Sequence, residues 1–345
     1  MRVGTARAVA ADWVRRYATH EPGFQGAYFS GSTIGMADEA ELPRASDVDV
    51  MLVTAAAKPP RKPGKFLYRN ALIEVTYLSS HQLASADEVL ASVHLAGSFR
   101  TDTIIADPTG HLRTLYTQVS RQFAERVWVR RRCQHARQAV EGFLRSIDTT
   151  APWHEQVSAW LFGTGVTTFV PLLAALRNPT VRLRYLAARE VLAAYGHTAL
   201  YEELLTLLGC INVTPARVNQ HVDELALTFD AADAVARTPY RFRSDISAAA
   251  RPIAIDGGRD LIRAGYHREA VFWIVATFAR AHTILTVDAP ELQRAHAPAF
   301  EAVLADLGVQ SSDDLLARGQ AAIKFLPRLW DTAEAIMATN PASAR

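Results

Sequence analysis

Three acidic residues lie in segments that otherwise have the composition of β-strands. Asp47 and Asp49 alternate with valines in the run DVDVMLVT, and Glu74 interrupts the apolar run ALIEVTYLS. Because successive side chains along a strand point to opposite faces of a sheet, this alternation places both aspartates on one face. Three carboxylates gathered at one patch repel one another, and a bound divalent cation relieves that repulsion. The pattern therefore predicts a site in which Asp47, Asp49 and Glu74 bind Mg²⁺ or Mn²⁺.

A Gly-Ser pair, Gly31 and Ser32, ends the short apolar run that precedes the aspartates. Glycine allows the backbone to approach a ligand closely, and Ser32 offers a hydroxyl and a backbone amide at the start of segment 33–40. A Gly-Ser pair alone is typical of an ordinary turn. Beside two aspartates and a strand glutamate, it predicts contact between Gly31, Ser32 and a phosphate group.

The elements that must position these residues form a small mixed sheet. The segments FQGAYFSG, DVDVMLVT, GKFLYRNALIEVTYLS and DTIIADPTG are short, rich in β-branched or aromatic residues and bounded by turn residues. The third segment predicts a hairpin that turns at Arg69-Asn70, and the Pro-rich stretch AAAKPPRKPG before it predicts an exposed loop. After Leu115 the apolar spacing is helical to the end, with a break near ARTPYRFRSD. We therefore expect an α+β fold, with a sheet domain at 1–115 followed by an all-α helical bundle domain at 116–345.

The length and composition agree with two folded domains. The 345 residues exceed the length of a usual single hydrophobic core, and 49% of them are hydrophobic.

No run reaches the roughly 18–20 uncharged apolar residues of a membrane helix, and the N-terminus lacks the pattern of a secretory signal, so we expect a cytoplasmic protein with no membrane partner. A net charge of +2 makes a long nucleic acid an unattractive partner. The cysteines, Cys133 and Cys210, are too few and too far apart for a zinc site.

One arginine-rich segment has two interpretations. The run RNPTVRLRYLAAREVL places Arg182, Arg184 and Arg189 near the expected start of a helix. These arginines either lie on the surface above an apolar stripe, or they contact a phosphate or a base.

The N-terminal part resembles the nucleotidyltransferase superfamily, whose members have a polymerase beta-like catalytic domain. The signature is an apolar residue and a Gly-Ser pair, then a loop, an Asp-x-Asp strand and an acid on a later strand. The matching residues are Phe29-Ser30-Gly31-Ser32, Ser46-Asp47-Val48-Asp49-Val50 and Ile73-Glu74-Val75. The specific match covers residues 29–78. Fourteen residues separate Ser32 from Asp47, which is more than the family usually allows.

The arrangement of a catalytic domain before a long helical half looks most like the antibiotic nucleotidyltransferases of the kanamycin type. This resemblance implies that Asp47, Asp49 and Glu74 hold magnesium on a nucleoside triphosphate, with ATP as the expected nucleotide, while an acceptor hydroxyl attacks the α-phosphate. It also implies that the helical domain closes the cleft and binds the acceptor, and that a glutamate in the region of Glu141 acts as the base. From its own surroundings, a solvated helix glutamate is the simpler account of Glu141, and Glu74 is the other candidate base.

The expected function is thus the transfer of a nucleoside monophosphate to a small molecule, either an aminoglycoside-like antibiotic or a metabolite, with release of pyrophosphate. One alternative keeps the chemistry and changes the acceptor to a protein side chain or RNA, as in toxin-like or RNA-tailing relatives. Another is a catalytically silent nucleotide-binding module, against which the complete acid triad counts. A homodimer with a shared site is left open.

Overall fold

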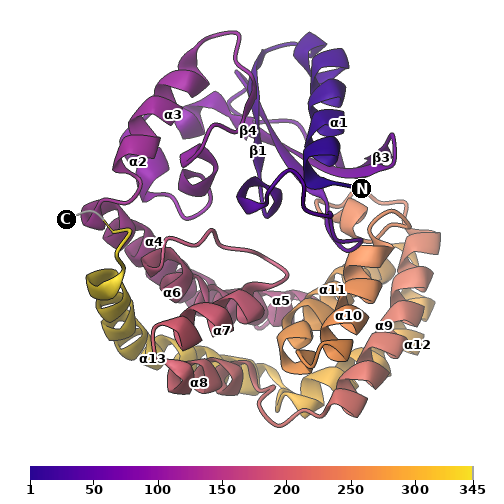
Figure 1. Cartoon of the computed structure of the whole chain (residues 1–345). Coiled ribbons are helices and arrows are strands. Elements are labelled where there is room, and N and C mark those ends of the chain that lie inside the picture. The colour runs from indigo at the N-terminus through magenta and orange to yellow at the C-terminus, as the bar shows by residue number, and fades with distance from the viewer. Residues whose placement is uncertain (344–345) are drawn as a thin grey trace. The chain divides into compact units, whose positions relative to one another are not determined.

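The computed structural model describes residues 1–343 and divides into two compact units, drawn in one view in Figure 1. The first comprises Met1–Arg132 and the second Cys133–Pro341. A mixed sheet in the first unit and helices in the second confirm the expected α+β class.

The division between the units lies inside helix α4 (Arg126–Arg145), whereas the boundary expected near residue 115 falls within helix α3 (His111–Gln122). Hydrogen bonds explain the later boundary. The guanidinium of Arg132 donates to the carbonyl oxygens of Leu90 and Phe123, at 2.9 and 2.6 Å. These bonds attach the first turns of α4 to the sheet unit.

The described part of the first unit contains a five-stranded sheet with the order β3-β4-β2-β1-β5. Strands β2 and β4 are parallel, and the other neighbours are antiparallel. The strands are β1 (Phe24–Ser30), β2 (Val48–Thr54), β3 (Gly64–Tyr68), β4 (Ala71–Ser79) and β5 (Ile104–Ala106). All of them fall in the segments predicted as strands.

The predicted hairpin is formed by β3 and β4. Its turn residues, Arg69 and Asn70, both have positive φ angles, of 46° and 66°. Positive φ at both central residues is characteristic of the two-residue turn that matches the twist of a hairpin. The turn therefore pairs Tyr68 with Ala71 and sets the register of the whole hairpin.

Helices cover both faces of the sheet. Helix α1 (Val3–Arg16) packs its buried residues Ala6, Ala10 and Val14 against the face that carries Val48 and Val50. On the opposite face, α2 (Ala86–Ala91) and α3 pack with the apolar residues near the far ends of β2 and β4. Figure 1 shows α1 on one side of the strands and α2 and α3 on the other. Short helical turns complete the unit: η1 (Ala18–His20), η2 (Thr33–Gly35), η3 (Ser80–Leu83) and η4 (Ala96–Phe99).

The second unit is built around α11 (His267–Asp288), which packs against α5, α9, α10 and α12. The predicted break is present, since α9 ends at Val235 and the next α-helix begins at Gly257. The other elements are α5 (Trp153–Val166), α6 (Phe169–Ala174), α7 (Arg184–Ala194), α8 (Thr198–Leu208), α9 (Pro215–Val235), η5 (Arg243–Asp245), η6 (Pro252–Asp256), α10 (Gly257–Arg263), α12 (Pro290–Asp306) and α13 (Ser312–Thr339).

Two helical segments, Trp153–Ala174 and His267–Asp288, are long and apolar enough to cross a membrane by length and composition. The expectation that no segment reaches this length was therefore wrong. The structure buries 83% and 78% of their apolar windows, so neighbouring helices cover most of this surface. Core helices that are apolar on all sides have this character.

Arg184 is also buried, contrary to the surface interpretation of its segment. Its side chain is 2% exposed, and the guanidinium carbon lies 4.0 Å from the ring centre of Phe272 and 4.8 Å from that of Phe169. Burial lowers the pKa of Arg184 to about 9. The electron-rich faces of the rings stabilise the cation in these surroundings.

Candidate metal centre

The three acids predicted to form a site come together. Asp47, Asp49 and Glu74 each offer a carboxylate oxygen within 4.8 Å of the others. Asp49 and Glu74 are directly paired across the parallel strands β2 and β4, and Asp47 is the residue that precedes β2. The convergence inferred from the alternation of the sequence is thus confirmed.

The acids belong to a row of polar residues that crosses four strands on one face. Ser30 is paired with Asp49, Asp49 with Glu74, and Glu74 with Lys65. Directly opposed residues of neighbouring strands share a face and lie in contact range. At one end of the row, the hydroxyl of Ser98 donates to that of Ser30 at 3.0 Å. The row therefore combines a hydroxyl, two carboxylates and an ammonium group.

Two lysines that the sequence analysis did not single out contact the acids. The ammonium group of Lys65 lies 2.9 Å from Asp47 Oδ2 and also contacts Glu74 Oε2. Lys62 Nζ lies 2.5 Å from Glu74 Oε1. The expectation that a bound cation must relieve the repulsion was therefore incomplete, because the protein supplies cations of its own.

The three carboxylates outnumber the ammonium groups that contact them, which are those of Lys62 and Lys65. Burial raises the pKa of Glu74, but Lys65 and Lys62 outweigh burial and hold that pKa at about 2. Burial, and then the charges of Asp47 and Glu74, raise the pKa of Asp49 well above its ordinary value. A bound cation would favour the ionised form of Asp49.

Gly31 makes room for Asp49. Its φ angle is +68°, and a Cβ built at this position would lie 1.7 Å from Asp49 Oδ2. The close approach at this glycine is made to the side chain of Asp49, and the predicted approach to a ligand stays a prediction. Glycine is the residue type that has no Cβ and adopts a positive φ angle without strain, so it is the residue that fits at this position.

The turn after Gly31 presents polar groups. Ser32 is exposed, and its side chain forms no capping hydrogen bond to η2, which begins at Thr33. Thr33 itself is fully buried, and its hydroxyl has no hydrogen-bond partner. This threonine was missed from the sequence because a single hydroxyl in a loop carries no recognisable pattern.

Glu141 lies in the second unit, in the part of α4 that follows the boundary. Its carboxylate is 3.8 Å from Arg137 Nε and 3.4 Å from Arg145 Nη2, one helical turn away on either side. These contacts agree with a solvated helix glutamate. Its role as a base stays a prediction.

The donor set fits a hard divalent cation. Carboxylate oxygens are the ligands that Mg²⁺, Mn²⁺ and Ca²⁺ prefer, and three of them lie within a short span here. Lys65 occupies oxygens of both Asp47 and Glu74, so a cation that uses those same oxygens has to compete with the lysine. The carboxylates can therefore bind a hard cation, and the two lysines can bind negatively charged groups.

Comparison of the chain with models of known protein families and with curated proteins found no match. The resemblance to nucleotidyltransferases therefore stays an expectation from the motifs in residues 29–78.

Replacing Gly31 by alanine should disrupt the site. Gly31→Ala adds a Cβ that collides with the Asp49 carboxylate in a conformation unfavourable for alanine, so we expect a loss of at least about 2 kcal/mol in the free energy of unfolding. Gly35→Ala is the matched control, since nothing lies within 4 Å of its added Cβ. Urea denaturation of both variants measures the difference. Equal stability of the two variants would show that Asp49 does not depend on Gly31.

The acids should differ in their effect on the metal-free protein. Glu74→Gln removes the carboxylate shared by two partly buried ammonium groups, while Lys65 keeps its contact with Asp47, and should lower the free energy of unfolding by on the order of 3 kcal/mol at neutral pH. Asp49→Asn removes a charge that burial disfavours, so its stability should equal or exceed that of the wild type. Denaturation in the presence of a chelator measures both. Loss of stability in Asp49→Asn as large as in Glu74→Gln would contradict this distribution of charge.

The ion pairs of Glu74 should make the free energy of unfolding depend on pH. The pKa of Glu74 is lowered in the folded state, so the stability contributed by its ion pairs is present above the ordinary value of 4.5 and is lost as pH falls towards about 2. We expect acid unfolding of the wild type to be steeper over this range than that of Glu74→Gln.

Proposed function

We propose that the chain is a metal-dependent nucleotidyltransferase that moves a nucleoside monophosphate from a nucleoside triphosphate to a hydroxyl group of a small molecule and releases pyrophosphate. ATP is the expected nucleotide. An aminoglycoside-like antibiotic or a metabolite is the expected acceptor. The observation that supports this proposal most is the convergence of Asp47, Asp49 and Glu74 beside the Gly31-Ser32 turn. The arrangement has the order of residues that the nucleotidyltransferase resemblance implies, with a longer loop between Ser32 and Asp47 than the family usually has.

The acids would hold the cation, and the neighbouring groups would bind the phosphates. When bound, Mg²⁺ or Mn²⁺ would offset the charge of the triphosphate and polarise the α-phosphate. The exposed hydroxyl of Ser32 and the backbone amides that follow it would donate to terminal phosphate oxygens. Lys62 and Lys65 supply two positive charges that can compensate the phosphates once Glu74 and Asp47 have another counter-ion.

The reaction itself needs one proton acceptor. The acceptor oxygen forms a bond to the α-phosphorus while the bond to pyrophosphate breaks, and the hydroxyl proton passes to a carboxylate. Glu74 is a weak base while its pKa is held at about 2 by two lysines. Glu141 is the other candidate from the sequence, and its carboxylate lies beside Arg137 and Arg145.

The nucleotide site can be tested by binding. Calorimetry with a non-hydrolysable ATP analogue should show binding that requires Mg²⁺ or Mn²⁺ and weakens at least about 100-fold, or some 2.7 kcal/mol, in Asp47→Ala with Asp49→Ala. The control is Asp87→Ala with Glu88→Ala, which removes two exposed acids of α2. Metal-independent binding of equal strength in all three proteins would rule the site out.

The acceptor can then be found with radiolabelled nucleoside triphosphates and magnesium, incubated with aminoglycosides, lincosamides, transfer RNA and total protein. Label on a small molecule supports the proposal. Label on RNA or protein would establish one of the alternative acceptors, and binding without any transfer would indicate a catalytically silent module.

Lys65 should compete with the metal. Lys65→Met removes the ammonium group bound to Asp47 and Glu74, so Mn²⁺ should bind the nucleotide-free variant at least about tenfold more tightly than it binds the wild type. Affinity for the metal-bound ATP analogue should not rise in parallel, because a positive charge near the phosphates is lost. Electron paramagnetic resonance of free Mn²⁺ measures the first effect. Lys58→Met, in the exposed loop, is the control, and equal Mn²⁺ affinity in both variants would contradict the competition.

A further inference from the structure

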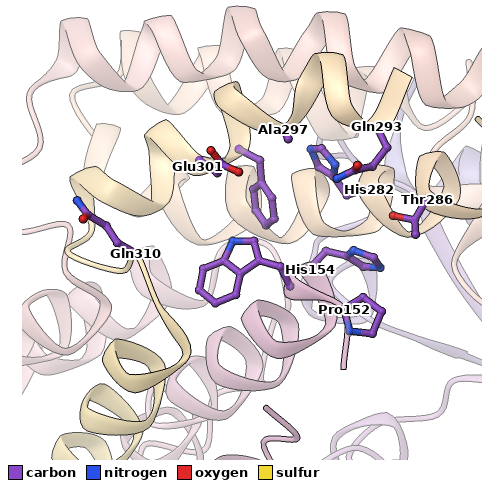
Figure 2. A pocket seen from close by; sticks show the side chains of 10 residues that line it. Pro152, His154, His282, Thr286, Gln293, Ala297, Glu301 and Gln310 are labelled. Carbon is purple, nitrogen blue, oxygen red and sulfur yellow. The ribbon is translucent and has the colours of Figure 1, made fainter. Parts of the chain in front are cut away.

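Two features of the structure lie outside the groups that the proposed function uses. One is a cavity of about 410 Å³ in the second unit, whose lining includes His282, Gln293 and Glu301 (Figure 2). His282 is 1% exposed and Phe300 stacks on its ring, so a molecule in the cavity cannot reach the ring nitrogens. The other feature is a set of contacts between helix α1 and the loop that follows Ser32, and these contacts bear on the nucleotide site.

The loop from Thr33 to Ser46 joins two groups of the proposed site, because Ser32 precedes it and Asp47 follows it. If no contacts held these fourteen residues, the two ends of the loop could take many positions relative to each other. A nucleotide that needs both Ser32 and the acids would then have to order the loop when it binds. The conformation of the loop therefore affects how strongly a nucleotide can bind.

Helix α1 holds the middle of this loop through backbone hydrogen bonds. The amide of Val3 donates to the carbonyl oxygen of Ala40 at 2.9 Å. The amide of Gly4 donates to that of Asp38 at 3.0 Å, and a Cβ built on Gly4 would lie 2.9 Å from the Cβ of Asp38. The first amides of a helix have no partner within the helix, so these bonds satisfy groups that would otherwise need water. Residues 36–42 thus form a strap that lies against the start of α1.

Arg7 adds a side-chain contact at the end of the strap that is nearest to Ser32. Its Nη2 donates to the carbonyl oxygen of Met36 at 2.5 Å and lies 3.3 Å from a carboxylate oxygen of Asp38. The Arg7 side chain is 23% exposed, and hydrogen bonds from a charged, partly buried group are stronger than those between neutral groups. Met36 directly follows the η2 turn, and its amide donates back to Thr33. One short turn therefore links Arg7 to Ser32.

The turn that carries Ser32 is held on both sides. Gly31, before Ser32, packs against the Asp49 carboxylate, and Met36, after it, is held by Arg7. We propose that Arg7 is a positioning residue, which fixes the strap and thereby holds the Ser32 turn in place for the phosphates of the nucleotide. This role rests on the proposed nucleotide site. Arg7 acts through the strap, so the three carboxylates should bind a metal ion without it.

Hydrogen exchange tests the strap in the absence of any ligand. Arg7→Ala removes the contacts to Met36 and Asp38, so peptides that cover residues 33–46 should exchange at least about fivefold faster by mass spectrometry. Arg15→Ala is the matched control, because Arg15 is an exposed arginine of the same helix. The control should exchange like the wild type.

Gly4→Ala opens the strap by a different route and leaves Arg7 in place. The added Cβ pushes Asp38 away, whereas alanine favours a helix more than glycine does, so α1 itself should not be weakened. We expect faster exchange of residues 33–46 with a melting temperature that stays close to that of the wild type. Exchange at the wild-type rate in both Arg7→Ala and Gly4→Ala would overturn the proposal.

Calorimetry with Mg²⁺ and the non-hydrolysable ATP analogue connects the strap with the nucleotide. The affinity should fall at least about tenfold in Arg7→Ala and Gly4→Ala, because the analogue then has to order the Ser32 turn. It should fall less in Arg7→Lys, whose ammonium group can still donate to Met36. The affinity for Mn²⁺ alone should stay within about twofold of the wild type in all three variants, since the three carboxylates are unchanged.

Two results would overturn the role of Arg7 and leave the nucleotide site standing. One is equal affinity for the analogue in the wild type, Arg7→Ala and Gly4→Ala. The other is a loss of Mn²⁺ affinity as large as the loss of analogue affinity, since the acids themselves would then have moved. A wild-type protein that binds no nucleotide would instead contradict the proposed function, and the role of Arg7 would fall with it.

Discussion

Three carboxylates can converge at one end of this sheet because two lysines converge there with them. Strand pairing fixes Asp49 opposite Glu74, so the two acids cannot move apart without breaking the ladder. Lys65 is paired with Glu74 from strand β3, and its ammonium group offsets the repulsion between the acids. The same group also contacts Asp47. The surrounding features follow from it: Gly31 leaves space for Asp49, and the loop before β3 returns Lys62 to Glu74. The result is a site whose three acids are held close together, with two lysines in contact with Asp47 and Glu74.

Much of the sheet could be predicted because a strand has a period of two. The alternation of acids and valines predicted a strand, and it predicted that Asp47 and Asp49 lie on the same face of that strand. Lys65 could also have been found, because a two-residue turn at Arg69-Asn70 places residue 65 opposite residue 74. Lys62 could not, since no periodicity governs the conformation of a proline-rich loop. The nucleotide, the acceptor and the base are chemical properties that neither the pattern nor the fold decides.

The helical unit was predictable in outline for a similar reason, with the period of 3.6 indicating helices. A helix that is apolar all round, such as α11, is expected in a core. Periodicity does not say what a polar side chain inside that core will touch. Arg184 lies against phenylalanine rings, whereas His282 reaches a cavity wall. Such contacts depend on helices far apart in sequence, so they appear only when the packing is known.

The distribution of the ion pairs along the chain bears on how the sheet can assemble. Lys62 and Lys65 are 12 and 9 residues from Glu74, all within the hairpin and the loop that leads into it. The parallel pairing of β4 with β2 joins residues 25 positions apart, from Asp49 to Glu74, and closes a larger loop. Local contacts cost less chain entropy to form than distant ones. The hairpin can therefore acquire its counter-ions before β2 docks, so that Glu74 enters the interior already neutralised and the chain avoids an intermediate with a lone buried charge.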